Sequence, residues 1–151
     1  MTRQEYIEKA LSLFNEGYAC AQSVLLSFAP DYGINEIHAK LIASTFGGGM
    51  GRLREKCGAV TGAFMVIGHA YGNTDPKDMD TKLNAYGKVR EINRIIQEIY
   101  GTTQCGEILR KHVREADVKD RKHHRIICVK VIAHTVGALY DILSASDVVE
   151  E

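Results

Sequence analysis

Apolar residues recur every three or four positions along almost the whole chain, and the strict alternation typical of a strand is nearly absent. This spacing places the apolar side chains on one face of each of several helices. We therefore predict an all-α fold, a single compact helical bundle of about five to seven helices. The chain has 151 residues, which is enough for one domain with its own core. Because no repeat, low-complexity tract or linker divides it, we expect residues 1–151 to form a single domain.

Glycine and proline mark where the expected helices end. These helices cover residues 3–14, 19–28, 35–46, 58–71, 75–100, 104–111 and 123–143, with a charged connection over residues 110–125. We expect three of them to bury apolar stripes, which are Ile37, Leu41, Ile42 and Thr45; Met79, Leu83, Tyr86, Val89, Ile92, Ile96 and Ile99; and Cys128, Ile132, Thr135, Leu139 and Ile142. The stripe of the long fifth helix also suits a homodimer interface, because two-fold dimers are the commonest oligomers.

The charges of the chain are balanced, with 19 Lys and Arg against 19 Asp and Glu. A net charge of zero gives no general attraction to nucleic acid or to an anionic membrane surface. The first residues alternate charged and apolar types, unlike a signal peptide. The apolar runs are shorter than the roughly 20 residues of a membrane helix. We expect a cytoplasmic protein that binds neither nucleic acid nor membrane.

Glycine fills four of the five positions from 47 to 51, a composition that disfavours a helix and predicts a tight loop. The loop fits neither phosphate-binding glycine motif, since no Gly-Lys-Ser/Thr follows it and Arg52 stands where G-x-G-x-x-G needs its third glycine. We expect it to supply positive φ angles and close packing. Small residues at the start of the next helix also allow close approach. The candidate cofactor-binding residues are Gly47, Gly48, Gly49 and Gly58.

Four cysteines stand alone in four different segments. Cys20, Cys57, Cys105 and Cys128 are separated by 36, 47 and 22 residues. The absence of any C-x-x-C pair argues against a zinc finger and against a thioredoxin-type motif. In a reducing compartment, single cysteines are buried apolar residues, metal ligands or catalytic thiols.

The expected helix boundaries place three of these cysteines at helix starts. Cys20, Cys57 and Cys105 would each face unpaired N–H groups and the positive end of a helix dipole, both of which favour thiolate. Basic residues before Cys57 add to the effect and make Cys57 the candidate catalytic thiolate. Cys128 lies in a buried stripe, where it stays protonated unless a metal or a partner sulfur meets it.

These residues together resemble a known family. Gly17-Tyr-Ala-Cys20, the glycine loop, Cys57-Gly-Ala-Val-Thr-Gly-Ala63, Cys105 and Cys128 are similar to the redox-active family named for its pattern, C_GCAxxG_C_C. The resemblance covers nearly the whole chain and implies one site that uses all four cysteines. Split-Soret cytochromes c are similar in their cysteine region, for which an iron–sulfur centre has been proposed. This chain has no C-x-x-C-H, so no covalent haem is expected.

Three chemistries suit four such cysteines. An iron–sulfur cluster held by Cys20, Cys57, Cys105 and Cys128 would serve electron transfer or redox sensing with an unknown partner. Thiol–disulfide exchange, with Cys57 as attacker, needs no metal. A structural zinc ion on the four thiolates would mark a non-enzymatic binding module. The sequence leaves open whether the protein is an enzyme, and whether His124 or a carboxylate joins the site.

Overall fold

The structure is a computed structural model that describes residues 1–112 and 121–149. The fold is all-helical within these residues. The helices are α1 (Arg3–Glu16), α2 (Cys20–Phe28), α3 (Glu36–Ala43), a short 3-10 turn η1 (Ser44–Phe46), α4 (Gly58–Tyr71), α5 (Met79–Tyr100), α6 (Cys105–His112) and α7 (Arg121–Val149). This confirms the prediction of an all-α bundle. Most of the charged connection predicted over residues 110–125 lies outside the described residues.

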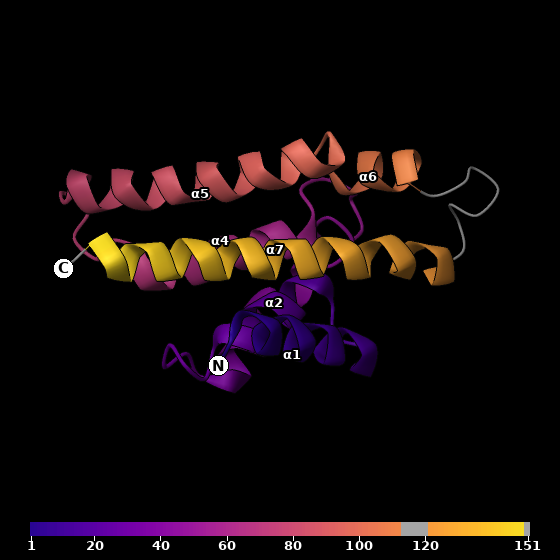
Figure 1. Ribbon diagram of the computed structural model, residues 1–151, viewed down its shortest axis with the longest axis horizontal. Helices are drawn as coiled ribbons and strands as arrows, with labels where there is room; N and C mark the ends of the chain where they lie inside the picture. Colours follow the sequence, from indigo (N-terminus) through magenta and orange to yellow (C-terminus); the bar gives the residue numbers. More distant parts are fainter. Residues whose placement is uncertain (113–120, 150–151) are drawn as a thin grey trace.

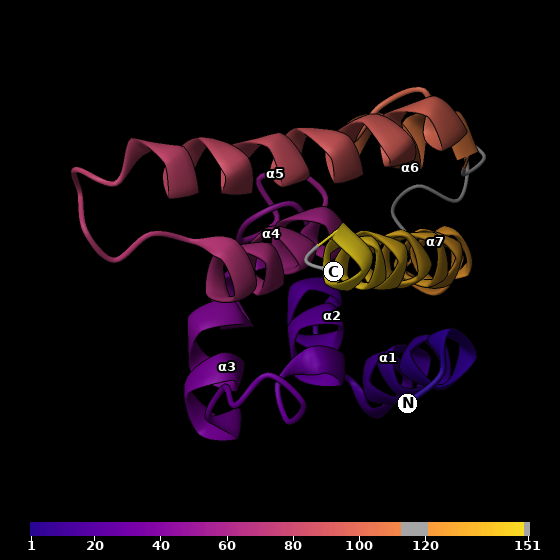
Figure 2. The same ribbon diagram turned by 60° about the vertical axis from the view of Figure 1, so that its left-hand side comes forward.

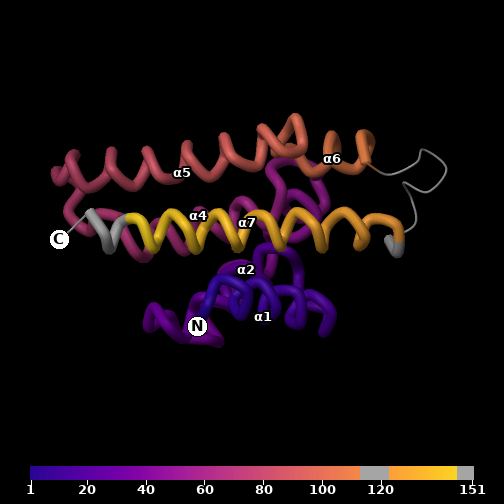
Figure 3. The backbone as a smooth tube through the Cα atoms, in the orientation of Figure 1, coloured from indigo at the N-terminus to yellow at the C-terminus, as the bar shows by residue number. Residues whose placement is uncertain are grey.

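The helices form three layers (Figure 1). α5 and α6 make one outer layer, α4 and α7 the middle layer, and α1, α2 and α3 the other outer layer, an arrangement also visible after a 60° turn (Figure 2). α7 packs on α1, α4 and α5, and α2 packs on α4. The trace in Figure 3 shows that segments far apart in sequence lie side by side along α7.

The helix ends follow the expected local chemistry. Thr2 and Glu5 form a capping box at the start of α1, and Gly17 ends that helix with a left-handed φ of 113°. The side chain of Asn35 accepts a hydrogen bond from the backbone of His38 at 2.9 Å and so caps α3. α5 begins later than predicted, because Asp78 caps it and residues 75–78 form a turn.

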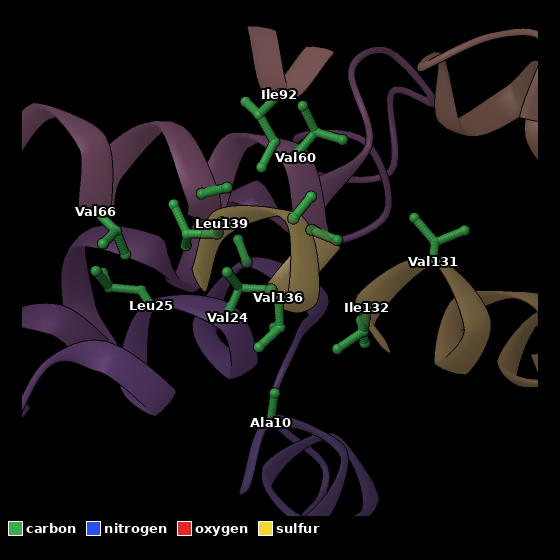
Figure 4. Packing of buried hydrophobic residues seen from close by; sticks show 14 of the residues in the cluster. Ala10, Val24, Leu25, Val60, Val66, Ile92, Val131, Ile132, Val136 and Leu139 are labelled. Atoms are coloured by element: carbon green, nitrogen blue, oxygen red, sulfur yellow. The ribbon is translucent and has the colours of Figure 1, made fainter. Parts of the chain in front are cut away.

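The core lies between the layers, around α7. Val24 of α2, Val60 of α4 and Leu139 of α7 have no exposed surface, and Figure 4 shows them converging from three helices. The predicted inward stripe of α7 is confirmed, since Ile132, Thr135, Leu139 and Ile142 are buried and Cys128 is half-buried. Each fully buried aliphatic side chain contributes about 1.5–3 kcal/mol to stability.

The stripe predicted for α3 is wrong, and the stripe predicted for α5 is wrong in part. α3 instead buries Ala39 and Ala43, and Ile37, Leu41, Ile42 and Thr45 are exposed. On α5 the helix buries Ile92 and Ile96 but exposes about half of Met79, Leu83, Tyr86 and Ile99. The reason is which face is covered: α3 packs on α2 and buries its alanines, and α5 packs on α4 and α7 along one side.

By length and composition, His123–Ala145 of α7 is long and apolar enough to cross a membrane. Most of its apolar residues pack into the core against α1, α4 and α5, and the central helix of a globular domain has the same character.

Candidate redox site built from four cysteines

Three cysteines lie at helix N-termini, as the sequence predicted. Cys20 is the first residue of α2, Cys57 is the N-cap of α4, and Cys105 is the first residue of α6. Cys128 lies within the inward-facing part of α7. Each cysteine therefore comes from a different helix, and three of them lie near backbone N–H groups that have no partner within their helix.

A short antiparallel pairing holds Cys57 beside Cys105. The amide of Cys57 donates to the carbonyl of Thr103 at 2.8 Å, and the amide of Cys105 donates to the carbonyl of Glu55 at 2.6 Å. Lys56 strengthens this pairing, because its ammonium donates to Thr103 Oγ1 at 2.6 Å and to Asn93 Oδ1 at 2.8 Å. The start of α4 and the start of α6 are thereby fixed to each other.

All four cysteines line one small cavity of about 20 Å³. The rest of its wall is apolar and comes from α4, α6 and α7, namely Ala59, Ile108, Leu109 and Val131. The same four cysteines also line a wider cleft of about 630 Å³. The four sulfur-bearing residues thus stand between an apolar interior and an open cleft. The fold brings together all four residues that the sequence proposed as one site.

The glycine loop packs closely against the cysteines of this site. Gly48 and Gly49 have φ of 65° and 72°, and a Cβ on Gly49 would stand 2.7 Å from Cys105 Cβ. Gly58 is crowded to a lesser degree, since a Cβ there would stand 3.2 Å from Cys20 Cβ. Both findings confirm the expected close packing. Gly47 differs, because its φ is −68° and only crowding by Ala19 keeps it small.

The expected low pKa of the helix-terminal thiols is wrong in this structure. Burial raises the pKa of Cys57 to about 12, although the backbone N–H groups of Ala59 and Val60 act in the opposite direction. Burial also raises the pKa of Cys105, against the nearby guanidinium of Arg54. Desolvation outweighs the helix dipole at these positions, so Cys57 is no ready thiolate in the metal-free protein.

Cys20 and Cys128 affect each other's protonation. The interaction between the two thiols raises the pKa of Cys20 and lowers that of Cys128. The positive charges of Arg54 and Arg125 further lower the pKa of Cys128. Of the four cysteines, Cys128 alone has its pKa lowered.

Arginines beside the sulfurs complete the electrostatics. Arg54 Nη1 lies 3.6 Å from Cys105 Sγ, whereas Lys56 points to Asn93 and Thr103. Arg125 was not identified from the sequence as part of the site. Arg125 precedes Cys128 by about one helical turn, and this spacing places the two side chains on the same face of the helix. His124 lines the wide cleft together with the four cysteines.

These features define a class: an all-helical protein with four convergent, largely buried cysteines. A family model matches residues 18–142, and its description is "Putative redox-active protein (C_GCAxxG_C_C)". The chain belongs to this family. No curated protein matches the chain, and no solved structure matches it.

Proposed function

We propose that Cys20, Cys57, Cys105 and Cys128 ligate one iron–sulfur cluster used for electron transfer or redox sensing. The observation that carries the proposal is convergence, because four cysteines from four helices line one cavity. Disulfide chemistry would need only two of them. Four cysteine thiolates are the common ligand set of two-iron and four-iron clusters.

The surroundings suit such a centre. The wide cleft of about 630 Å³ gives space on one side of the sulfurs. The glycines of the loop and of the start of α4 keep Cβ atoms away from that space. Arg54 and Arg125 supply positive charge that offsets the charge of thiolates. When bound, the cluster would supply one-electron transfer, and the chain's own residues would set its charge environment and limit its contact with water.

The grouping of the donors gives a single zinc ion no support. Zinc held by thiolates needs its sulfurs about 2.3 Å from one point. No three His, Cys, Asp or Glu side chains in the described part of the chain are grouped so as to hold one metal ion. In a four-iron cluster each thiolate binds its own iron, so the four sulfurs surround a larger core.

A second candidate rests on the interaction between Cys20 and Cys128, which line the same small cavity. Two neighbouring thiols can close a disulfide, releasing two electrons to an acceptor and two protons. In that case Cys128, and not Cys57, would be the attacking thiolate. This chemistry would leave Cys57 and Cys105 without a direct role.

Serine variants of the four cysteines separate these candidates. The protein is purified without oxygen, and its visible absorption and iron content are compared between wild type and each single Cys→Ser variant. We expect every variant to lose or alter the absorption. Met65→Leu is the control, because Met65 also carries sulfur and lies on α4 but lines neither cavity. Loss of redox behaviour in Cys20→Ser and Cys128→Ser alone would favour the disulfide and sink the cluster.

A further inference from the structure

The wide cleft is positively charged far beyond what the chain's composition predicts. The chain as a whole balances 19 basic residues with 19 acidic residues. The described residues that line the cleft include Arg52, Arg54, Arg125 and His124 but no aspartate or glutamate. A cleft with positive walls concentrates anions. Its volume of about 630 Å³ lies within the range of small-molecule sites.

The three arginines are not neutralised by carboxylates in the described part of the chain, where the ion pairs involve other residues. Arg54 contacts Cys105 Sγ at 3.6 Å. Arg125 donates to the carbonyl of Phe14 at 3.0 Å and lies 4.2 Å from the centre of its ring. Both side chains are therefore held in place at the cleft without losing their charge.

Of the three arginines, Arg52 has the most guanidinium donors available to a ligand. Its aliphatic stem lies over Gly48, where a Cβ would come within 2.7 Å of Arg52 Cγ. Among the described residues its side chain has neither an ion pair nor a hydrogen bond. Its backbone is held at φ 62°, a costly left-handed conformation for a residue with a Cβ. The loop holds the guanidinium at the cleft despite the energetic cost of this backbone conformation.

The loop backbone adds further donors. Gly48, Gly49 and Gly51 line the cleft, and their amides donate to no acceptor within the described residues. The neighbouring amides of Met50 and Arg52 are bonded internally, to the carbonyls of Phe46 and Gly47. Free amides gathered in a turn make a concave surface that suits an anion.

We propose that the cleft binds a small oxyanion or carboxylate, held by the guanidinium of Arg52 and the free amides of the glycine loop, beside the four cysteines. Guanidinium groups bind such anions through paired, charge-assisted hydrogen bonds. The redox centre would then work on, or respond to, a bound small anion. The binding site itself stands on the cleft and its charges and does not depend on which group the cysteines hold.

Calorimetric titration of the anaerobically purified protein tests this proposal, with inorganic phosphate, sulfate and oxalate as probes at millimolar concentration. We expect at least one probe to bind with a 1:1 stoichiometry. Arg52→Gln should weaken that binding about tenfold or more, as expected for losing a charge-assisted hydrogen bond. Arg52→Lys keeps the positive charge but lacks the paired donors. Its affinity for the anion should lie between those of the wild type and Arg52→Gln.

The control is Arg90→Gln, which removes the same charge from an exposed position of α5 that does not line the cleft. It should leave binding unchanged. Failure of all three probes to bind would overturn the proposal, and so would equal losses in Arg52→Gln and Arg90→Gln. Binding through Arg52 by a protein without iron would contradict the proposed cluster and leave the anion site standing.

Discussion

Opposing electrostatic effects act on each cysteine of the site. A helix N-terminus favours thiolate, whereas removal from water favours thiol. At Cys57, which is only 8% exposed, burial prevails and raises the pKa to about 12. At Cys128 the interaction with Cys20 and the charges of two arginines prevail and lower the pKa. The metal-free site is therefore asymmetric, because the pKa of Cys128 is lowered and the pKa values of the other three cysteines are raised.

This asymmetry predicts the order of alkylation in reduced, metal-free protein. Cys128 should react with iodoacetamide before Cys57 at neutral pH, because the thiolate is the reacting form. The rate at Cys57 should continue to rise with pH toward about 12, the pKa set by its burial. Peptide mass spectrometry after timed quenching measures both rates. Faster labelling of Cys57 than of Cys128 would contradict this order. It would support the expectation that the helix N-terminus lowers the pKa of Cys57.

The sequence predicted the position of each cysteine but not its protonation. Helix starts depend on local residues, so Gly17 and the glycine loop allow them to be predicted from the sequence. Burial depends on side chains from other helices, such as Leu109 and Val131, which spacing along the chain does not reveal. The pairing of Cys20 with Cys128 likewise joins residues that are far apart in sequence.

At the scale of elements, the glycine loop brings α4 and α6 together. Gly49 carries the tightest constraint, because a Cβ there would lie 2.7 Å from both Cys105 Cβ and the amide nitrogen of Glu55. Its φ of 72° is also unfavourable for any residue with a side chain. The loop therefore specifies where Cys105 stands.

We predict that Gly49→Ala lowers the free energy of unfolding by about 2 kcal/mol or more, from strain and overpacking together. It should also displace Cys105 and reduce the bound iron. The control is Gly68→Ala on α4, where a Cβ meets nothing within 4 Å. That change should stabilise the helix by about 0.5–1 kcal/mol. Urea unfolding measures both variants, and equal stability of the two would refute the constraint.

Helix boundaries were predicted well, and inward faces less well. Asn35 and Gly101 mark true helix ends because capping is a local interaction. The exposed Leu41 and Leu83 were predicted to be buried, since periodicity shows that a helix has an apolar face but not whether another element covers it. The homodimer predicted from the stripe of α5 stays a prediction, and its exposed apolar residues are where we would expect the contact.

At the scale of the whole molecule, three layers bring four cysteines to the wall of one cavity. α2 comes from one outer layer, α6 from the other, and α4 and α7 from the middle (Figure 1). The resemblance to the four-cysteine family anticipated this convergence. Periodicity and composition alone did not, because the pairing of residues 54–57 with 103–106 joins segments that lie far apart in the sequence. The layers thus assemble a four-cysteine site that exists only in the folded protein.

The central claim is that the four cysteines hold one iron–sulfur cluster. The most direct test is to purify the untagged protein without oxygen and to measure its visible spectrum with its iron, acid-labile sulfide and zinc content. We predict broad visible absorption with iron and sulfide in equal amounts. A colourless protein free of iron and sulfide would contradict the claim. Zinc in that protein would point to a structural site, and the absence of metal to disulfide exchange between Cys20 and Cys128.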